Sequence, residues 1–201
     1  MRGFRWFIAS VLLAFLGAVL VQGQQNKDKD GGQDKSKDKA ESKDKAESIA
    51  PYFPTPETIV DRMLKLGELK AGETIFDLGS GDGRIVIDAA RKYKARAIGV
   101  ELNDSLYKQS VDRIRTLGLA PTAQIIHGDL LKQDYSSADL LTVYLLPVAT
   151  DLVTPILEKQ LKKGARVVAH DFQFASWKAE RTVDIDDDGE GRAHELYLYR
   201  R

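Results

Sequence analysis

Residues 77–83 read DLGSGDG, and this short stretch decides which fold the rest of the chain can adopt. Thr74, Ile75 and Phe76, with Leu78, predict a buried strand that leads into the glycines, and the periodicity of residues 85–93 predicts a helix after them. A glycine-rich loop between a strand and a helix is where doubly wound α/β sheets hold a ligand. Glycine permits positive φ and lets the backbone approach that ligand closely. The stretch therefore predicts a ligand site at the carboxyl end of a parallel sheet.

The spacing of the loop glycines indicates the kind of ligand. They follow the pattern GxGxG, whereas a dinucleotide fingerprint is GxGxxG and would need a glycine at Arg84. Asp77, two residues before the first glycine and at the end of the predicted strand, would repel a pyrophosphate but suits a ligand with a cationic aminoacyl end. S-adenosylmethionine has that end and carries no phosphate, so it is the expected cofactor, and a nicotinamide-dependent oxidoreductase is disfavoured. The loop residues expected to contact the cofactor are Gly79, Ser80, Gly81 and Gly83.

Two further acids follow the next two predicted strands. Glu101 lies 24 residues after Asp77, where a carboxylate accepts the ribose hydroxyls of a cofactor bound at the strand ends. Asp129 follows the third strand and can meet the adenine amino group, with Leu130 against the ring. The alternative is that Asp77 caps the following helix while Glu101 and Asp129 are surface acids. Three acids at successive strand ends favour the cofactor site.

The rest of the folded part alternates strands with helices. Such alternation predicts a Rossmann-like α/β fold, with a mostly parallel sheet and helices on both faces. A C-terminal hairpin with a turn-rich connection is expected to close the sheet in antiparallel fashion. The strands are expected at residues 74–78, 97–100, 123–126, 139–146, 165–169, 182–185 and 195–199, and the helices at residues 56–66, 85–93, 105–117 and 152–161.

Three local features complete this pattern. Thr55 is expected to cap the first helix with Pro56 in its first helical position, and Ser105 is expected to cap the third. The acidic run 186–188 resembles a calcium loop only superficially, because ligands at alternate positions and a distal glutamate are missing. We interpret it as a solvated turn, and no metal site is predicted.

The first 49 residues differ from a globular domain. Arg2 and Arg5 precede an uncharged, mostly apolar run over residues 6–21, and small residues follow it. Residues 1–23 are therefore expected to be a secretory signal peptide, with an uncleaved membrane anchor or a misassigned start codon as alternatives. Residues 24–49 carry seven Lys and seven acidic residues and are expected to be a disordered linker. Residues 50–201 form the expected catalytic domain.

The location of that domain follows from the leader. It is expected to be exported or anchored at a membrane. However, lysines directly after the apolar run resist translocation, so a cytoplasmic orientation stays open.

Composition narrows the function further. The chain has 201 residues and no cysteine, which excludes disulfides, thiolate catalysis and cysteine-based metal sites. Residues 50–201 hold 21 basic and 23 acidic residues, and nucleic-acid binders usually have a basic surplus. Nucleic acid is therefore not an expected partner.

The motifs resemble those of a known family. The runs DLGSGDGRIVIDAA, GVEL and GDL are similar to the motifs of class I S-adenosylmethionine-dependent methyltransferases. Residues 51–56, 144–147 and 164–168, with Trp177, resemble one branch. These are the small protein-lysine methyltransferases of the ATP synthase c-subunit and adenine nucleotide translocase type, with bacterial relatives. The resemblance implies a protein lysine as the methyl acceptor, and a pre-domain segment that places Tyr52 and Thr55 at the methionine end.

The fourth strand is where the acceptor should enter. Enzymes that methylate amides or base amino groups typically carry Asn/Asp-Pro-Pro-Tyr/Phe there, whereas this chain has YLLP at residues 144–147. Tyr144 is the candidate residue for orienting the nucleophile, with a packed structural tyrosine as the alternative. His170 is a candidate proton acceptor, although a structural histidine is favoured. A small-molecule methyltransferase and a non-catalytic cofactor-binding module remain alternatives for the whole domain.

Overall fold

The computed structural model describes residues 52–201. The leader and the linker predicted at residues 1–49 lie outside this part of the chain. Within residues 52–201, no helix combines the length and apolar character that crossing a membrane requires.

Seven strands form one sheet, and helices cover both of its faces. The strands are β1 (Thr74–Leu78), β2 (Arg96–Glu101), β3 (Ala123–His127), β4 (Leu140–Val143), β5 (Arg166–His170), β6 (Arg181–Ile185) and β7 (His194–Arg200). The helices are α1 (Glu57–Leu66), α2 (Arg84–Tyr93), α3 (Asp104–Thr116), the 3-10 turn η1 (Leu130–Lys132) and α4 (Pro147–Gln160). The strand order is β3-β2-β1-β4-β5-β7-β6, and β7 runs antiparallel to both of its neighbours. This confirms the Rossmann-like α/β prediction and its closing hairpin.

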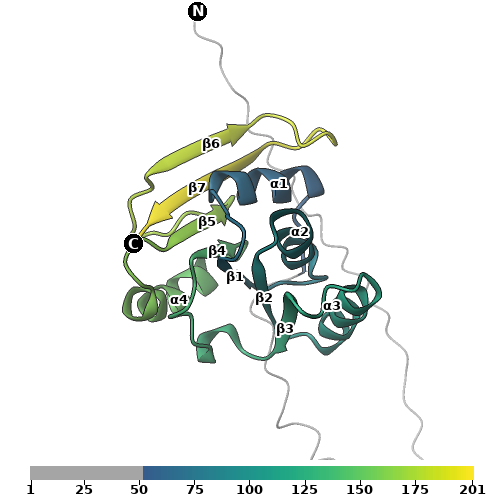
Figure 1. Ribbon diagram of the computed structural model, residues 1–201. Helices are drawn as coiled ribbons and strands as arrows, with labels where there is room; N and C mark the ends of the chain where they lie inside the picture. Colours follow the sequence, from purple (N-terminus) through teal and green to yellow (C-terminus); the bar gives the residue numbers. More distant parts are fainter. Residues whose placement is uncertain (1–51) are drawn as a thin grey trace, which may run out of the picture. The chain divides into compact units, whose positions relative to one another are not determined.

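The sheet separates two apolar cores. Ile75 of β1 packs with buried residues of α1 and α2, whereas Phe76 and Leu78 pack with those of α4. Figure 1 shows α1, α2 and α3 on one side of the sheet and α4 on the other. Alternate residues of one strand therefore serve opposite faces, as parallel strands buried on both sides require.

The strand order reverses direction at β1. From β1 the chain builds outward through β2 and β3, and it then returns to place β4 on the other side of β1. Such a reversal opens a crevice at the carboxyl ends of the strands. The glycine loop follows β1 and therefore lies at this crevice.

Two predicted helix caps are wrong. Helix α1 begins at Glu57, so Pro56 is its N-cap, and the Thr55 hydroxyl lies 3.4 Å from Nδ1 of His170 instead. Helix α3 begins at Asp104, and Asn103 caps it by accepting a 3.0 Å hydrogen bond from the backbone N–H of Leu106. In each case the capping residue lies one or two positions from the predicted one, a shift that sequence pattern alone does not resolve.

The boundary between β4 and α4 also differs from the prediction. The strand ends at Val143 instead of Leu146, and the helix begins at Pro147 instead of Leu152. Proline suits the first helical position because its missing N–H would have no partner there. The apolar run 144–146 is thus a link between the two elements, and it brings Tyr144 to the crevice.

The turn at residues 186–191 is only partly solvated. Asp186 and Asp187 are exposed, but the side chain of Asp188 is fully buried. It accepts hydrogen bonds from the backbone N–H of Glu190 at 2.8 Å and from Nε of Arg192 at 2.9 Å. The prediction of a solvated turn is therefore wrong for Asp188, which organises the turn from inside.

Candidate functional site

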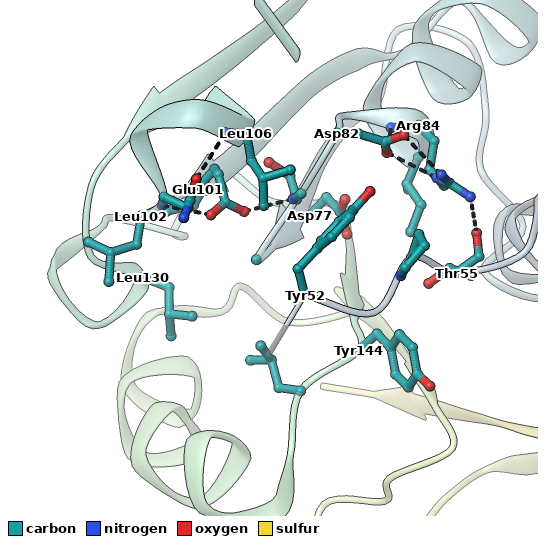
Figure 2. A pocket seen from close by; sticks show the side chains of 18 of the residues that line it. Tyr52, Thr55, Asp77, Asp82, Arg84, Glu101, Leu102, Leu106, Leu130 and Tyr144 are labelled. Carbon is teal, nitrogen blue, oxygen red and sulfur yellow. Dashed lines mark hydrogen bonds and ion pairs between the residues drawn. The ribbon is translucent and has the colours of Figure 1, made fainter. Parts of the chain in front are cut away.

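A cavity of about 530 Å³ opens at the carboxyl ends of β1, β2 and β4, a volume typical of small-molecule sites. It brings together most of the predicted site residues, which are drawn in part in Figure 2. The predicted residues that line it are Tyr52, Thr55, Asp77, Gly79, Ser80, Gly81, Glu101, Asp129, Leu130 and Tyr144.

The glycine loop is held against the end of β2. Gly79 and Ser80 both donate backbone hydrogen bonds to the carbonyl of Val100, at 3.0 and 2.9 Å. Gly81 donates its N–H to Oε2 of Glu101 at 2.7 Å. Gly79 and Gly81 have φ values of 74° and 53°, which residues other than glycine rarely adopt. The loop is therefore a fixed floor of the cavity.

Gly83 does not line the cavity. It is the N-cap of α2 with φ 77°, and a Cβ there would lie 3.0 Å from Cβ of Ser110 on α3. Its missing side chain thus serves the close packing of two helices.

Asp77 is a buried carboxyl group at the centre of the site. Burial raises its pKa to about 7, a 2.8 Å hydrogen bond from the Thr142 hydroxyl opposes the shift, and Glu101 and Asp82 add to it. Asp77 does not cap α2, since Gly83 occupies that position without a side-chain cap bond. Among residues 52–201 no basic side chain forms an ion pair with it, and a buried carboxyl group of this kind suits a positively charged ligand group.

Glu101 and the pair Tyr144 and Thr55 lie at opposite ends of the cavity (Figure 2). The carboxylate of Glu101 is nearly buried and accepts backbone N–H bonds from Gly81 at 2.7 Å and from Asn103 at 2.8 Å. Each carboxylate oxygen has a second lone pair, so both can also accept a ligand hydroxyl.

Asp129 and Leu130 begin the 3-10 turn η1 beside Glu101. One carboxylate oxygen of Asp129 accepts a 2.8 Å hydrogen bond from the backbone N–H of Leu131. The backbone carbonyl of Leu130 accepts a 2.6 Å hydrogen bond from the Tyr135 hydroxyl. Leu102 and Leu106, which the sequence analysis missed, also line the cavity here. Together with Leu130 they form an apolar wall that fits an aromatic base (Figure 2).

The segment before α1 covers part of the cavity. The guanidinium of Arg84 donates to the backbone carbonyl of Thr55 at 2.8 Å and pairs with Asp82 at 2.9 Å. Tyr52 lies so close to the loop that a Cβ on Gly81 would come within 2.6 Å of its ring. The sequence analysis used Arg84 only as evidence against a dinucleotide motif. In the structure, Arg84 holds the segment before α1 over the cavity through its hydrogen bond to Thr55.

Tyr144 lies at the Thr55 end of the cavity. Its ring packs on His170 with centroids 4.0 Å apart. Burial raises the pKa of Tyr144 to about 12, with the charge of Asp171 adding to the shift, so its hydroxyl stays neutral near pH 7. Tyr144 is therefore both packed and cavity-lining.

His170 is completely buried behind Tyr144. Burial lowers its pKa to about 4, Asp171 opposes the shift, and His194 adds to it. His170 is absent from the described residues that line the cavity, but it contacts two residues that do line it, Thr55 and Tyr144.

The fold, the glycine loop and the acids at three strand ends define a class I S-adenosylmethionine-dependent methyltransferase. The chain belongs to the family described as the ANTKMT methyltransferase domain, whose model matches residues 77–181. The acidic pocket and apolar wall fit the cofactor of this class.

Two curated relatives resemble the chain over most of its described part. A protein-lysine N-methyltransferase of Saccharolobus islandicus is 37% identical over 74% of this chain and 92% of its own length. The lysine N-methyltransferase that acts on the ATP synthase c-subunit in Rattus norvegicus is 33% identical over 66% of this chain, which spans 61% of that relative.

A solved structure has the same fold. It is an RNA methyltransferase from Salinibacter ruber in complex with S-adenosyl-L-homocysteine, with a TM-score of 0.69 and 41% sequence identity. The match covers 74% of this chain and 93% of that one.

Proposed function

We propose that the chain transfers the methyl group of S-adenosylmethionine to the side-chain amine of a protein lysine. The observation that carries this proposal is the match to nearly the full length of the Saccharolobus islandicus relative, which is named as a protein-lysine N-methyltransferase. The lack of Asn/Asp-Pro-Pro-Tyr/Phe after β4 counts against amide and base amino groups as acceptors.

The cofactor supplies a methyl group on a sulfonium, and the residues of this chain supply its orientation. Asp77 would pair with the ammonium of the aminoacyl end, and Glu101 would accept hydrogen bonds from the ribose hydroxyls. Leu102, Leu106 and Leu130 would enclose the adenine. The acceptor would then enter at the end of the cavity that Thr55 and Tyr144 line.

The acceptor lysine must reach the methyl group as a neutral amine. Desolvation at the buried end of the cavity lowers the pKa of an amine and favours that form. The neutral Tyr144 hydroxyl can then accept a hydrogen bond from the amine and align its lone pair for in-line attack, with reacting atoms about 3 Å apart.

Labelled methyl transfer tests the proposal directly. Residues 50–201 are incubated with labelled S-adenosylmethionine and with protein, RNA and metabolite fractions of a cell extract. We expect the label in protein, recovered as methyl-lysine after hydrolysis. We expect Tyr144→Phe to reduce transfer by about 10-fold or more while cofactor affinity stays unchanged. Label in metabolites alone, or binding without any transfer, would reject the lysine proposal.

RNA is the second candidate acceptor, because the 41% identical structure is described as an RNA methyltransferase. The balance of 21 basic and 23 acidic residues in residues 50–201 argues against it, since RNA binding draws on a basic surplus. Nuclease and protease treatment of the labelled extract separates the two candidates. Nuclease-sensitive, protease-resistant label would favour RNA.

Replacement of Glu101 tests the ribose contact. Hydrogen bonds to a charged partner contribute roughly 1.5–3 kcal/mol each, so Glu101→Ala should lower cofactor affinity at least about 10-fold. Calorimetry measures the affinity, and circular dichroism checks the fold, because Glu101 also holds the Gly81 N–H. Unchanged affinity in a folded variant would place the ribose elsewhere.

We propose further that residues 1–23 export or anchor the chain and that residues 24–49 form a flexible linker, with the methyltransferase domain beginning near Ala50. The opening apolar run and the balanced Lys/Asp composition support this. A fragment beginning at Ala50 should bind the cofactor as tightly as the full chain. A C-terminal fusion shows the compartment, and mapping of the mature N-terminus shows whether the leader is cleaved. Loss of binding on truncation would mean that the linker is part of the domain.

A further inference from the structure

Three potential ligand atoms converge behind Tyr144, outside the cofactor cavity. Nε2 of His170 lies 2.9 Å from Nδ1 of His194 and 3.4 Å from Oδ2 of Asp171, and Nδ1 of His194 lies 3.1 Å from the same oxygen. His170 ends β5 and His194 begins β7, so the pairing of two antiparallel neighbours creates the cluster. The exposed fractions of the three side chains are 0%, 5% and 24% for His170, His194 and Asp171.

The triangle has the dimensions of a metal site. Zinc binds histidine nitrogen and carboxylate oxygen at about 2.0–2.2 Å, which separates neighbouring ligands of a tetrahedral ion by ~3.3 Å. We propose that His170, Asp171 and His194 bind a divalent transition-metal ion through these atoms, with zinc as the best match. A two-histidine, one-carboxylate set suits such ions and leaves a fourth position open.

The outer side of each ligand is fixed, as metal ligands require. The buried carboxylate of Asp188 lies 3.3 Å from Nε2 of His194, and an acceptor at this position favours the tautomer in which Nε2 carries the proton and the lone pair of Nδ1 faces the other two ligand atoms. The Thr55 hydroxyl lies 3.4 Å from Nδ1 of His170. The other oxygen of Asp171 accepts the N–H of Glu195 at 3.0 Å. Partners of this kind orient metal-bound imidazoles and carboxylates.

The backbone of Asp171 supports the same conclusion. Its φ of 58° lies in the left-handed region, which residues other than glycine seldom adopt. Strained backbone persists only where its surroundings hold it, and it is common at ligand sites. Here the conformation turns Oδ2 towards the two histidines.

The ion would connect three parts of the fold near the acceptor end of the cavity. It would join β5 to β7, Thr55 contacts one of its ligands, and Tyr144 packs on the same ring. Its presence would therefore help to fix the two cavity-lining residues where the acceptor enters. The proposal itself does not depend on the acceptor being lysine.

Metal titration of the full chain tests the inference. The protein is treated with a chelator and then titrated with Zn²⁺ and with Co²⁺ in a competition assay. We expect one ion per chain and the intense visible absorption of tetrahedral Co²⁺. His194→Gln and Asp171→Asn should each weaken binding at least 100-fold, and Asp188→Asn should weaken it about 10–100-fold.

His127→Gln is the matched control. The chain has three histidines and no cysteine, and His127 is exposed on β3 with its Nε2 3.1 Å from the Leu102 carbonyl. This variant should bind the ion like the wild type. The proposal is overturned if the wild-type chain takes up no ion at micromolar zinc, or if His194→Gln binds as well as His127→Gln. It is also overturned if NMR shows His194 doubly protonated in the presence of zinc. The wild-type titration decides the matter even if a variant fails to fold.

Discussion

Asp77→Asn is expected to lower affinity for S-adenosylmethionine at least about 100-fold while leaving the domain folded. The substitution removes the buried charge proposed to pair with the ammonium of the cofactor, and breaking a buried pair costs about 3–5 kcal/mol. In the wild type the Thr142 hydroxyl donates a 2.8 Å hydrogen bond to Asp77. Asparagine keeps an oxygen that can accept this bond, so the contact between β1 and β4 is retained. Isothermal titration calorimetry measures the affinity.

The pH dependence of binding provides a second measurement on the same residue. Without ligand the pKa of Asp77 is raised to about 7, so below that pH the carboxyl group is mostly protonated. The ammonium requires the ionised form. Affinity should therefore fall by up to about tenfold for each pH unit below 7 and level off above it. The Asp77→Asn variant should lose this dependence.

The same shift predicts an effect of opposite sign on stability. Between the unfolded pKa near 4 and the folded pKa near 7, the folded state holds a proton that the unfolded state has released. The free energy of unfolding of the ligand-free protein therefore decreases as pH rises through this window, by at most on the order of 4 kcal/mol. Ligand-free Asp77→Asn should be more stable than the wild type at pH 8, and the difference should vanish towards pH 4.

Asp88→Asn is the matched control for cofactor affinity and for the pH dependence of binding. Asp88 is a buried acid on α2 that pairs with Arg91 and Lys92 and does not line the cofactor cavity. Its substitution should leave cofactor affinity and the pH dependence of binding unchanged. If Asp77→Asn behaved like this control, Asp77 would not be the ammonium partner.

The sequence was sufficient to predict those site residues that lie at the carboxyl ends of strands. Asp77, Glu101 and Asp129 each lie at or just after the end of an apolar run, and parallel strands bring their carboxyl ends to one edge. Thr55 was placed correctly at the cavity and wrongly as a cap, because a shift of one residue decides which group its hydroxyl meets.

Contacts between distant segments were beyond the sequence. The cluster of His170, Asp171 and His194 depends on how β7 returns beside β5, which no local pattern specifies. Arg84 similarly fastens a segment 29 residues earlier in the chain, through a carbonyl that carries no sequence signal. Both depend on tertiary packing.

Gly99 on β2 was missed for a different reason. Its φ is not in the left-handed region, and its sequence context is that of an ordinary strand residue. A Cβ there would overlap Oγ and Cβ of Ser80, and it would lie 2.6 Å from Cδ1 of Ile125. The absence of a side chain at Gly99 therefore leaves room for Ser80, where the glycine loop packs against β2.

Gly99→Ala should consequently destabilise the domain by about 1–3 kcal/mol, as overpacking of a rigid site does. It should also weaken cofactor binding, because a displaced Ser80 pulls the loop off the Val100 carbonyl that now anchors it. Thermal unfolding and calorimetry measure the two effects. Gly128→Ala is the control for stability alone, since its Cβ would meet the flexible side-chain amide of Gln133 at 3.3 Å, whereas Gly128 itself lines the cavity.

A second substitution should reverse the effect of the first. Within residues 52–201 the buried Ser80 hydroxyl has no hydrogen-bond partner, so its removal sacrifices no such bond. Ser80→Gly deletes both Ser80 atoms that the new methyl group would overlap, and only the flexible end of Ile125 remains to adjust. The double variant should recover most of the stability and affinity lost in Gly99→Ala, with a coupling energy of about 1 kcal/mol or more. Additive losses in the double variant would show that Gly99 matters for the strand itself and not for the loop that lies over it.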